Sequence, residues 1–413
     1  MKILQICKKF PYPAKDGESV AILNIAAALK SVGCRIDLLA MNTTKHWVDN
    51  PMDIQKLQYY DHIYAVPVDN RLSIGGALSA LVKGDSYHVS RYRNEDFARK
   101  LVEVLKTHHY DVVQMETVYL SHYVDLVRAH TDALIVLRAH NVEHEIWQRI
   151  TKNTRFAPKR WYLSLLTQQL KNYELEHFNK YDFIVAISNR DMQHIKSLGY
   201  NNGTTFTPVG VKRLHSVRIP ATSANGATVR VGFIGSLDWM PNLEGIHWFL
   251  NHVWPSILKS YSNVELHIAG RNTPTDIFQL HGKDRITVHG EVPDAEQFVL
   301  SCDVMIVPLF SGSGMRVKII ESMLLGRPIV TTSIGLEGIP ARHEKEILIA
   351  DSPNDFICQL SKLIEHPNLR LQLAQRAQQL LKEEYDLQKF ATELVHAYRT
   401  HLATKRRAKE TSL

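Results

Sequence analysis

Residues 311–326, with the sequence SGSGMRVKIIESMLLG, combine residue types that could bind a polyanion. Apolar segments at 304–307 and 328–332 flank them, so we predict a strand, a glycine-containing loop, a helix and a second strand. The free N–H groups and the dipole at the helix start favour an anion, and glycine lets the backbone approach it closely. Arg316 and Lys318 fall in the first turn, where the dipole disfavours cations, so we expect a bound polyanion to offset them.

Glu321 lies five residues after Arg316, and we expect it to face the same ligand. A diphosphate with a neighbouring sugar hydroxyl would satisfy both cations and Glu321 together. The alternative is that Arg316 and Lys318 are solvated and that Glu321 pairs with Lys318 across one turn. The local pattern leaves both interpretations open, because glycine loops before helices are common in α/β proteins.

A second candidate site is the segment KKFPYPAKDGES at residues 8–19, which follows the first apolar segment at 3–6. Ligands of open α/β sheets bind outside the carboxyl ends of strands, so Asp16 and Gly17 are expected to face the ligand. We expect Ser19 to cap the following helix. The alternative is an ordinary turn between a strand and a helix.

A third candidate is the segment RAHNVEHE at residues 138–145, which follows a predicted strand at 133–137. His140 would stand at the strand end, and histidine titrates near neutral pH. We expect Asn141 and Glu143 to orient His140 and Arg138 to contact an anionic ligand. The alternative is a set of surface polar residues at a helix start.

His140, Glu143 and His144 also follow the His-x-x-Glu-His order of a class of zinc peptidases. That chemistry requires one continuous helix that directs both histidines at one metal. His140 comes only three residues after a predicted strand, so zinc proteolysis is a remote alternative.

The chain contains no Asp-x-Asp pair, which the metal-dependent nucleotide-sugar enzymes use to hold a divalent ion on the diphosphate. Its absence favours neutralisation by Arg316, Lys318 and backbone dipoles, with no metal. The sequence also lacks G-x-G-x-x-G and G-x-x-x-x-G-K-[ST], so a dinucleotide dehydrogenase or a P-loop ATPase has little support.

Composition and periodicity predict two doubly wound α/β domains with parallel sheets. The chain has 413 residues, enough for about two domains, and short apolar segments alternate twice with longer amphipathic ones. We predict helices at 19–31, 95–106, 119–130, 158–180, 369–382 and 387–401, and a linker at 211–228. The predicted strands are residues 3–6, 36–40, 63–66, 112–115, 133–137, 183–187, 204–207, 229–234, 264–268, 286–288, 304–307, 329–332 and 347–349.

The net charge of +7 could serve nucleic acid, an anionic membrane or an anionic substrate. Nucleic-acid-binding motifs are absent, so we expect no nucleic-acid partner. The basic cluster at 405–407 is either a peripheral membrane contact or a solvated, frayed tail. Four scattered cysteines without a CxxC pair indicate buried thiols. Without an evident signal peptide or membrane span, we expect a cytoplasmic protein, with possible peripheral contact at the inner membrane face.

The stretch GSGMRVKIIE at residues 312–321 resembles the nucleotide-sugar loop of retaining glycosyltransferases of family four, which have the GT-B fold. Further similar segments are GFIGS at 232–236, MPN at 240–242, LHIAG at 266–270, VHG at 288–290 and TTSIG at 331–335 with EG at 337–338. The resemblance implies two Rossmann-like domains facing across a cleft. It places an acceptor-side domain at 1–212, a nucleotide-sugar-binding domain at 213–385, and a C-terminal helix with a basic tail, returning to the first domain, at 386–413.

The resemblance also implies roles for individual residues. The expected catalytic residues are His140, Arg316, Lys318 and Glu321. The expected donor-binding residues are Gly17, Gly235, Asn242, Gly314, Met315, Arg316, Lys318 and Glu321. His140 would contact the transferred sugar, and Asn242 would contact the ligand or cap a helix beginning near Leu243.

The sequence departs from the family pattern at two places. Ser313 stands where the first of two acids is usual, and the Arg and Lys expected after the first strand of the second domain are replaced by SLDWMPN at 236–242. Asp238 in this segment is acidic and cannot replace them. We infer that Arg316 and Lys318 hold the diphosphate instead.

Together these features predict a metal-independent hexosyltransferase of polysaccharide biosynthesis, and the resemblance alone implies that it retains the anomeric configuration. Its co-substrate would be a nucleoside-diphosphate sugar, and no other cofactor is expected. The acceptor would be a hydroxyl of a carbohydrate, a lipid-linked glycan or a small molecule. The alternative from another class is a partner subunit that binds nucleotide sugars without turnover.

The missing Asp-x-Asp pair generates a test with metals. Turnover should persist in excess chelator and should not rise with added magnesium or manganese, because side-chain cations rather than a metal would neutralise the diphosphate. Initial rates with and without EDTA measure this. A strict requirement for a divalent ion would contradict it.

Overall fold

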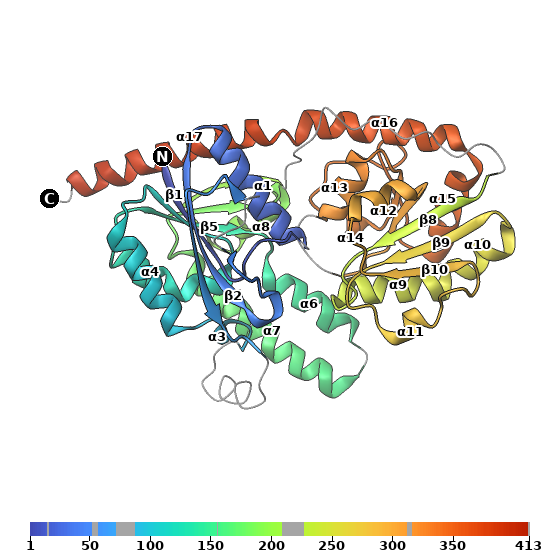
Figure 1. The fold of residues 1–413 in the computed structure, drawn as a ribbon, viewed down its shortest axis with the longest axis horizontal. Helices are drawn as coiled ribbons and strands as arrows, with labels where there is room; N and C mark the ends of the chain where they lie inside the picture. Colours follow the sequence, from blue (N-terminus) through green and yellow to red (C-terminus); the bar gives the residue numbers. More distant parts are fainter. Residues whose placement is uncertain are drawn as a thin grey trace. The chain divides into compact units, whose positions relative to one another are not determined.

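Strands and helices alternate along the chain and build two separate parallel sheets (Figure 1). The computed structural model describes residues 1–14, 16–51, 57–71, 87–154, 156–208, 227–311 and 316–411. The chain divides into unit 1, made of Met1–Gly210 with Leu387–Leu413, and unit 2, Val211–Asp386. The boundary expected at 212/213 and most of the predicted linker lie outside the described residues.

The sheet of unit 1 has seven parallel strands in the order β3-β2-β1-β4-β5-β6-β7. Its strands are β1 Lys2–Cys7, β2 Arg35–Thr43, β3 His62–Val68, β4 Val112–Met115, β5 Leu134–Ala139, β6 Phe183–Ala186 and β7 Gly203–Phe206. Its helices are α1 Gly17–Ser31, η1 Thr44–His46, α3 Tyr87–Ser90, α4 Glu95–Thr107, η4 Val118–Tyr123, α5 Val124–Arg128, α6 Glu143–Asn153, α7 Ala157–Phe178, α8 Asn189–Ser197 and α17 Leu387–Thr411.

The sheet of unit 2 has six parallel strands in the order β10-β9-β8-β11-β12-β13. Its strands are β8 Val229–Ile234, β9 Val264–Ala269, β10 Ile286–Gly290, β11 Val304–Val307, β12 Ile329–Thr331 and β13 Leu348–Ile349. Its helices are α9 Met240–His252, α10 Trp254–Ser260, α11 Thr275–Phe278, α12 Ala295–Ser301, α13 Val317–Leu324, α14 Ser333–Leu336, α15 Pro353–Glu365 and α16 Pro367–Glu384. The predicted α/β class with two doubly wound parallel sheets is confirmed.

The central strands of unit 1 send alternate side chains to two apolar layers, because successive residues of a strand face opposite sides of the sheet. In β1, Leu4 and Ile6 join the layer that includes α4 residues, whereas Ile3 and Cys7 join the layer that includes α1 residues. The near-continuous apolar strands follow from burial on both faces, as is usual for parallel sheets.

The last helix, α17, packs on unit 1, in the same layer as α1. Leu394 and Tyr398 are buried there, and the Tyr398 hydroxyl donates a hydrogen bond to Gln114 Oε1 in β4 at 2.7 Å. Lys405 Nζ contacts Asp182 Oδ2 at 2.8 Å and the carbonyl of Ala133 at 2.9 Å. Residues 405–407 therefore belong to a helix that continues to Thr411, and the frayed tail considered from sequence is wrong.

Two local expectations are also corrected. The helix predicted at 119–130 is a 3-10 helix, η4, followed by the short α5. Thr117 caps the start of η4 by accepting the backbone N–H of Tyr119, and α5 begins at Val124. Cys358 is exposed, whereas Cys7, Cys34 and Cys302 are buried free thiols. Cys358 lies in the amphipathic α15, whose buried stripe is formed by other residues.

Within the described parts of the chain, every helix is too short or too polar to cross a membrane.

The contact between α17 and β4 generates a stability test. Tyr398→Phe should lower the free energy of unfolding by about 1–3 kcal/mol, because it leaves the buried Gln114 carbonyl without its donor. The midpoint of urea unfolding measures this. Tyr162→Phe removes an exposed hydroxyl from α7 and should change little. Equal midpoints for the two variants would show that the buried hydrogen bond contributes no net stability.

Candidate functional site

The candidate residues of each unit gather at the carboxyl ends of the central strands. In unit 2, β8 and β11 are neighbours, and the chain proceeds from them toward opposite edges of the sheet. In unit 1, β1 and β4 have the same relation. Such switch points leave a crevice beyond the strand ends, where doubly wound sheets bind ligands. The topology therefore gives each unit one preferred ligand position.

Lys318 reaches the carboxyl end of β8 from the second residue of α13. Its ammonium donates to Asn242 Oδ1 at 2.7 Å and to the carbonyl of Ile234 at 3.3 Å. It also lies 5.1 Å from the centroid of the Phe233 ring. Lys318 thus ties the start of α13 to the end of β8 and the first turn of α9, and the solvated Lys318 considered from sequence is wrong.

Asn242 does not cap a helix, contrary to one expectation. α9 begins at Met240, so Asn242 already lies in its first turn, where its Nδ2 donates to the carbonyl of Ser236 at 2.9 Å. The Pro at position 241 starts the helix earlier than expected, since proline is well suited to a first helical turn. Asn242 therefore orients the Lys318 ammonium.

Gly235 leaves the space that this pair occupies. A Cβ at position 235 would come within 2.8 Å of Asn242 Nδ2 and 3.0 Å of Lys318 Nζ, closer than ordinary contact. A side chain at this position would displace the ammonium, so the absence of a side chain at Gly235 is a condition for the site.

The Lys318 ammonium is partly buried and has one cationic neighbour, Arg316. Burial lowers the pKa of Lys318, and the positive charge of Arg316 lowers it further, to about 7. Arg316 is the N-cap residue of α13 rather than a member of its first turn. Two cations at a helix N-terminus oppose the helix dipole, and an anion bound there would relieve the repulsion.

The remaining predicted residues of this region are Glu321 and those of the glycine loop. Glu321 is exposed on α13, one turn after Lys318. Ser311 is buried and donates to Glu244 Oε2 of α9 at 2.9 Å, which anchors the start of the glycine loop. Gly314 and Met315, like Ser313, lie outside the described residues.

Arg271 is a cation of this region that sequence reasoning missed. It follows β9, the neighbour of β8, and its Nε donates to Ser236 Oγ at 3.2 Å. The backbone is close here, because a Cβ at Gly270 would lie 2.0 Å from the carbonyl of Gly235. The available signal was a basic residue directly after the strand-ending motif LHIAG.

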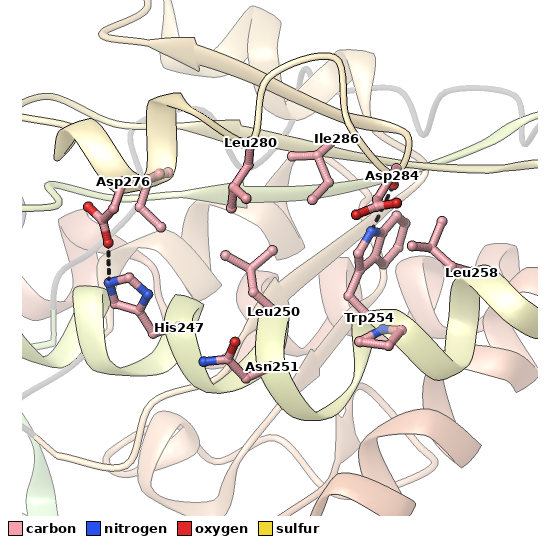
Figure 2. A pocket seen from close by; sticks show the side chains of 11 residues that line it. His247, Leu250, Asn251, Trp254, Leu258, Asp276, Leu280, Asp284 and Ile286 are labelled. Atoms are coloured by element: carbon pink, nitrogen blue, oxygen red, sulfur yellow. Dashed lines mark hydrogen bonds and ion pairs between the residues drawn. The ribbon is translucent and has the colours of Figure 1, made fainter.

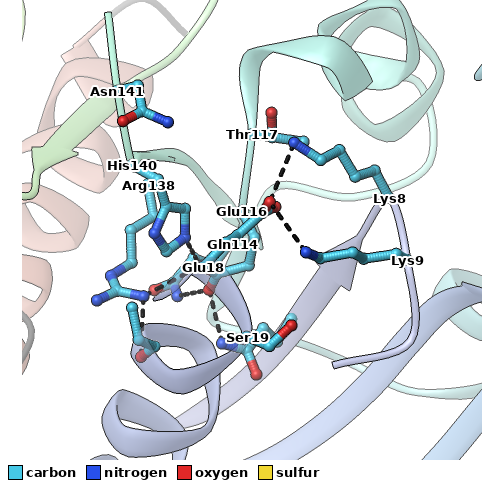
Figure 3. Close-up of polar contacts among 12 residues, drawn as sticks. Lys8, Lys9, Glu18, Ser19, Gln114, Glu116, Thr117, Arg138, His140 and Asn141 are labelled. Atoms are coloured by element: carbon cyan, nitrogen blue, oxygen red, sulfur yellow. Dashed lines mark hydrogen bonds and ion pairs between the residues drawn. The ribbon is translucent and has the colours of Figure 1, made fainter. Parts of the chain in front are cut away.

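In unit 1 two lysines that follow β1 form ion pairs with acidic residues at the start of α1 (Figure 3). Lys9 Nζ contacts Asp16 Oδ2 at 2.6 Å, and Lys8 Nζ contacts Glu18 Oε2 at 3.2 Å. Asp16 is the N-cap of α1, where its side chain accepts from the backbone N–H of Ser19, and Gly17 is the first helical residue. The expected cap at Ser19 is wrong, because Asp16 precedes it and already accepts that N–H.

His140 follows β5 and is held by Glu116, which follows β4 (Figure 3). His140 Nε2 lies 2.8 Å from Glu116 Oε2, and Arg138 Nη1 donates to the same oxygen at 3.2 Å. Glu116 Oε1 accepts from Gln5 Nε2 at 2.6 Å and from Gln114 Nε2 at 2.5 Å. Four donors thus converge on one fully buried carboxylate.

These contacts set the protonation states. Burial alone would raise the pKa of Glu116, but the Arg138 charge and the hydrogen bond from His140 outweigh it and lower the pKa to about 2. Burial lowers the pKa of His140, and Glu116 offsets this only in part. An ionised Glu116 facing a neutral His140 requires the proton on Nε2, which places the imidazole lone pair on Nδ1.

Two sequence expectations around His140 are corrected. Glu116, rather than Glu143, orients it, because Glu116 Oε2 lies 2.8 Å from His140 Nε2, whereas Glu143 accepts from the Tyr119 hydroxyl at 3.0 Å. The expected role of Asn141 stays a prediction. Arg138 is 1% exposed, and its guanidinium binds Glu116 and the carbonyl of Ala21, so it is a buried counter-ion rather than a ligand contact.

The zinc-peptidase interpretation is not supported. His140 contacts Glu116, whereas His144 lies in α6 and its Nδ1 is 2.5 Å from Glu174 Oε2. The imidazoles of His140 and His144 are therefore held by different carboxylates. His140 precedes α6 and His144 is its second residue, so the two histidines do not share one helix.

Among the described residues, Asp37, His62 and His108 bring possible metal-ligand atoms within 4.8 Å of one another. Their chemistry does not favour a metal. The imidazole rings are stacked, with centroids 5.1 Å apart and 24° between their planes, so their in-plane lone pairs do not converge. Asp37 Oδ2 already contacts Lys2 Nζ at 3.1 Å and the Tyr110 hydroxyl at 2.7 Å.

A groove of about 440 Å³ lies in unit 2 among α9, α10, α11 and β10 (Figure 2). Trp254 Nε1 donates to the carbonyl of Asp284 at its edge, and His247 faces Asp276. Its lining does not include Gly235, Asn242 or any residue of α13, so the groove is separate from the cationic site.

The geometry defines a two-unit α/β protein of the GT-B type with a cationic site at the second switch point. Residues 228–366 match the family model described as glycosyl transferases group 1. The matched segment covers about a third of the chain and lies within unit 2, Val211–Asp386.

Other proteins are similar over nearly the whole chain. A Klebsiella pneumoniae protein described as an uncharacterized 44.6 kDa protein in the cps region is 26% identical over 94% of this chain and 97% of its own. The sucrose-phosphate synthase of Thermosynechococcus elongatus has a similar fold, with a TM-score of 0.71 and 13% identity. The match covers 98% of this chain and 100% of the synthase chain. The structure of Anabaena HepE in complex with UDP-glucose has a TM-score of 0.63 and 14% sequence identity, and the match covers 97% of this chain and 100% of HepE.

The space at Gly235 generates a binding test. Gly235→Ala should fold, because the new Cβ meets only the ends of two flexible side chains, but it should displace Lys318. Nucleoside-diphosphate affinity should fall roughly tenfold or more, since hydrogen bonds to charged groups contribute about 1.5–3 kcal/mol. Calorimetry measures this.

Asn242→Ala should weaken binding in the same direction, whereas Asn251→Ala on the same helix provides a matched control and should not. Full affinity in both Gly235→Ala and Asn242→Ala would show that the orientation of Lys318 is unimportant for the ligand.

Proposed function

We propose that this protein is a glycosyltransferase that moves a hexose from a nucleoside-diphosphate hexose to a hydroxyl acceptor, with retention of anomeric configuration and without a bound metal. The observation that carries the proposal is the Lys318 ammonium, which is held at the end of β8 by Asn242 beside a second cation at the start of α13. The proposal of retention rests on the family that the loop resembles.

The proposed role of unit 2 is to stabilise the leaving diphosphate. Negative charge grows on the diphosphate as the bond to the sugar breaks, and pre-oriented donors stabilise it without reorganising. Lys318, Arg316 and the N–H groups at the start of α13 would supply these donors. Glu321, exposed on the same helix, would accept a hydrogen bond from a ribose hydroxyl.

The proposed role of unit 1 is to contact the transferred sugar through His140. A neutral imidazole with its lone pair on Nδ1 can accept a hydrogen bond from a sugar hydroxyl. Glu116 would act as a positioning residue, because it fixes the orientation and the tautomer of the ring. Asp16 and Gly17 lie at the start of α1, after the loop that follows β1, and are proposed to border the same ligand.

UDP-hexoses are the first donors to test, because the structure of HepE holds UDP-glucose. A carbohydrate or lipid-linked acceptor of polysaccharide biosynthesis is proposed because the Klebsiella relative is described as lying in the cps region. The buried free thiols support a reducing, cytoplasmic setting. A thermal-shift panel of UDP, GDP, ADP and TDP sugars would test the donor class, since a selective ligand raises the melting temperature by mass action.

The pKa of Lys318 generates a test of the anion site. Below pH 7 Lys318 is charged in the free protein, and above pH 7 it is increasingly neutral. A bound diphosphate would raise this pKa, so binding should take up a proton and weaken as the pH rises above 7. Calorimetry at pH 8 in buffers of different ionisation enthalpy measures the uptake.

Lys318→Ala and Arg316→Ala should each weaken binding by about 1.5–3 kcal/mol. Lys318→Ala should abolish the proton uptake, whereas Arg316→Ala should only reduce it, because loss of the Arg316 charge raises the pKa of Lys318 in the free protein. Unchanged affinity in both variants would refute the assigned anion site.

The division of roles generates a second test. Glu321→Ala should weaken binding of the bare nucleoside diphosphate. His140→Ala should leave that binding almost intact and lower turnover, because its contact matters mainly as charge develops at the sugar. Calorimetry with the diphosphate and initial rates with the full donor measure the pair.

If His140→Ala lost diphosphate affinity as strongly as Glu321→Ala, or kept full turnover, the assignment would be wrong. Donor hydrolysis without acceptor separates an enzyme from a partner subunit, which should show none above background.

A further inference from the structure

The turn between α6 and α7 exposes an unusual group of large apolar side chains. Phe156 is 67% exposed and Trp161 is 71% exposed, and Tyr162 and Leu165 are 39% and 37% exposed. The two helices lie side by side as a hairpin of unit 1 (Figure 1). We call residues 152–154 and 156–165 the hairpin tip. Contiguous exposed apolar groups on a folded domain usually mark a binding surface.

The exposed apolar face of α7 is distinct from the face that packs on the protein. Leu163, Leu166 and Leu170 are buried. Trp161 lies nine residues before Leu170, and at about 100° per residue that separation places it on the opposite side of the helix. Leu165 is one turn after Trp161 and continues the same exposed face. The helix therefore carries a second apolar stripe in addition to the one that holds it in the core.

The same segment is strongly basic. Between Glu145 and Glu174, residues 146–173 contain no Asp or Glu and six basic residues. These are Arg149, Lys152, Arg155, Lys159, Arg160 and Lys171. Lys152, Lys159 and Arg160 are exposed in the hairpin tip beside the aromatic residues. The surface therefore combines aromatic groups with an excess of positive charge.

We propose that the hairpin tip binds the surface of an anionic lipid bilayer. Tryptophan and phenylalanine favour the boundary between headgroups and acyl chains, and lysine and arginine are attracted to anionic headgroups. This surface goes beyond the proposed transfer reaction, and its test does not depend on turnover.

Charge distinguishes this occupant from others. In a symmetric contact between two copies, the same basic patch would face itself and repel. The basic cluster at 405–407 is a weaker candidate for the membrane contact, because Lys405 is already bound to Asp182 and to the carbonyl of Ala133. The hairpin tip offers both the apolar groups and the charge that such a surface requires.

The test is flotation of the full chain with phosphatidylglycerol-containing vesicles and with phosphatidylcholine vesicles. The chain should float with the anionic vesicles and bind the zwitterionic vesicles much less. Phe156→Ser with Trp161→Ser should reduce binding at least about tenfold. Lys159→Gln with Arg160→Gln should reduce it by about fivefold per charge, from roughly 1 kcal/mol for each basic residue near an anionic surface.

Two matched controls should retain binding. Trp47→Ser removes another exposed tryptophan of unit 1, and Arg406→Gln with Arg407→Gln removes an equal charge from α17. All variants should keep the melting temperature and the nucleoside-diphosphate affinity of the parent.

Several outcomes would overturn the proposal. These are failure of the parent chain to float, equal loss of binding in the control variants, and a dimer that dissociates when Trp161 is replaced. Tighter binding of single-stranded RNA than of anionic vesicles by the parent, lost in the hairpin variants, would assign the surface to nucleic acid instead.

Discussion

The buried Glu116 carboxylate is the constraint on which the organisation of unit 1 depends. An isolated charge in a protein interior is strongly unfavourable, so it must be neutralised and hydrogen bonded. Here Gln5 of β1, Gln114 of β4 and Arg138 of β5 all donate to it, together with His140. These strands are neighbours in the sheet, so one charge fixes their side chains in a single arrangement. The orientation of His140 follows from that arrangement.

Unit 2 has the opposite charge arrangement, with positive charge concentrated at its candidate site. Its central groups are cations near a helix N-terminus, and in the described part of the chain the oxygen partners of Lys318 are neutral, from Asn242 and Ile234. Burial and the neighbouring Arg316 charge lower the pKa of Lys318, so its ammonium is easier to deprotonate than that of a surface lysine. A negatively charged ligand would neutralise the cations of unit 2, whereas the charge of Glu116 in unit 1 is already neutralised by Arg138. The first unit is thus electrostatically complete around its histidine, and the second is arranged to receive an anion.

The candidate site and the hairpin tip differ in how completely their side chains are packed. At the strand ends, charged groups are packed against named partners, and even the space at Gly235 is used by Asn242 and Lys318. In the hairpin tip, Trp161 and Phe156 remain largely exposed, although α7 has a buried stripe of its own. Natural domains rarely leave such groups together without a partner. The surface chemistry therefore favours an external apolar and anionic phase.

The sequence by itself determined the two doubly wound sheets, because apolar strands alternating with amphipathic helices admit few other architectures. It also predicts Lys318, His140 and Glu321 as site residues, since ligands of such sheets bind beyond the carboxyl ends of the strands. Only the tertiary structure revealed Glu116, although single polar residues inside three apolar strands, Gln5, Gln114 and Arg138, were a visible signal. The partners of a buried charge come from strands far apart in sequence. Periodicity records which face a residue occupies, whereas the neighbour it meets there is decided by strand order and register.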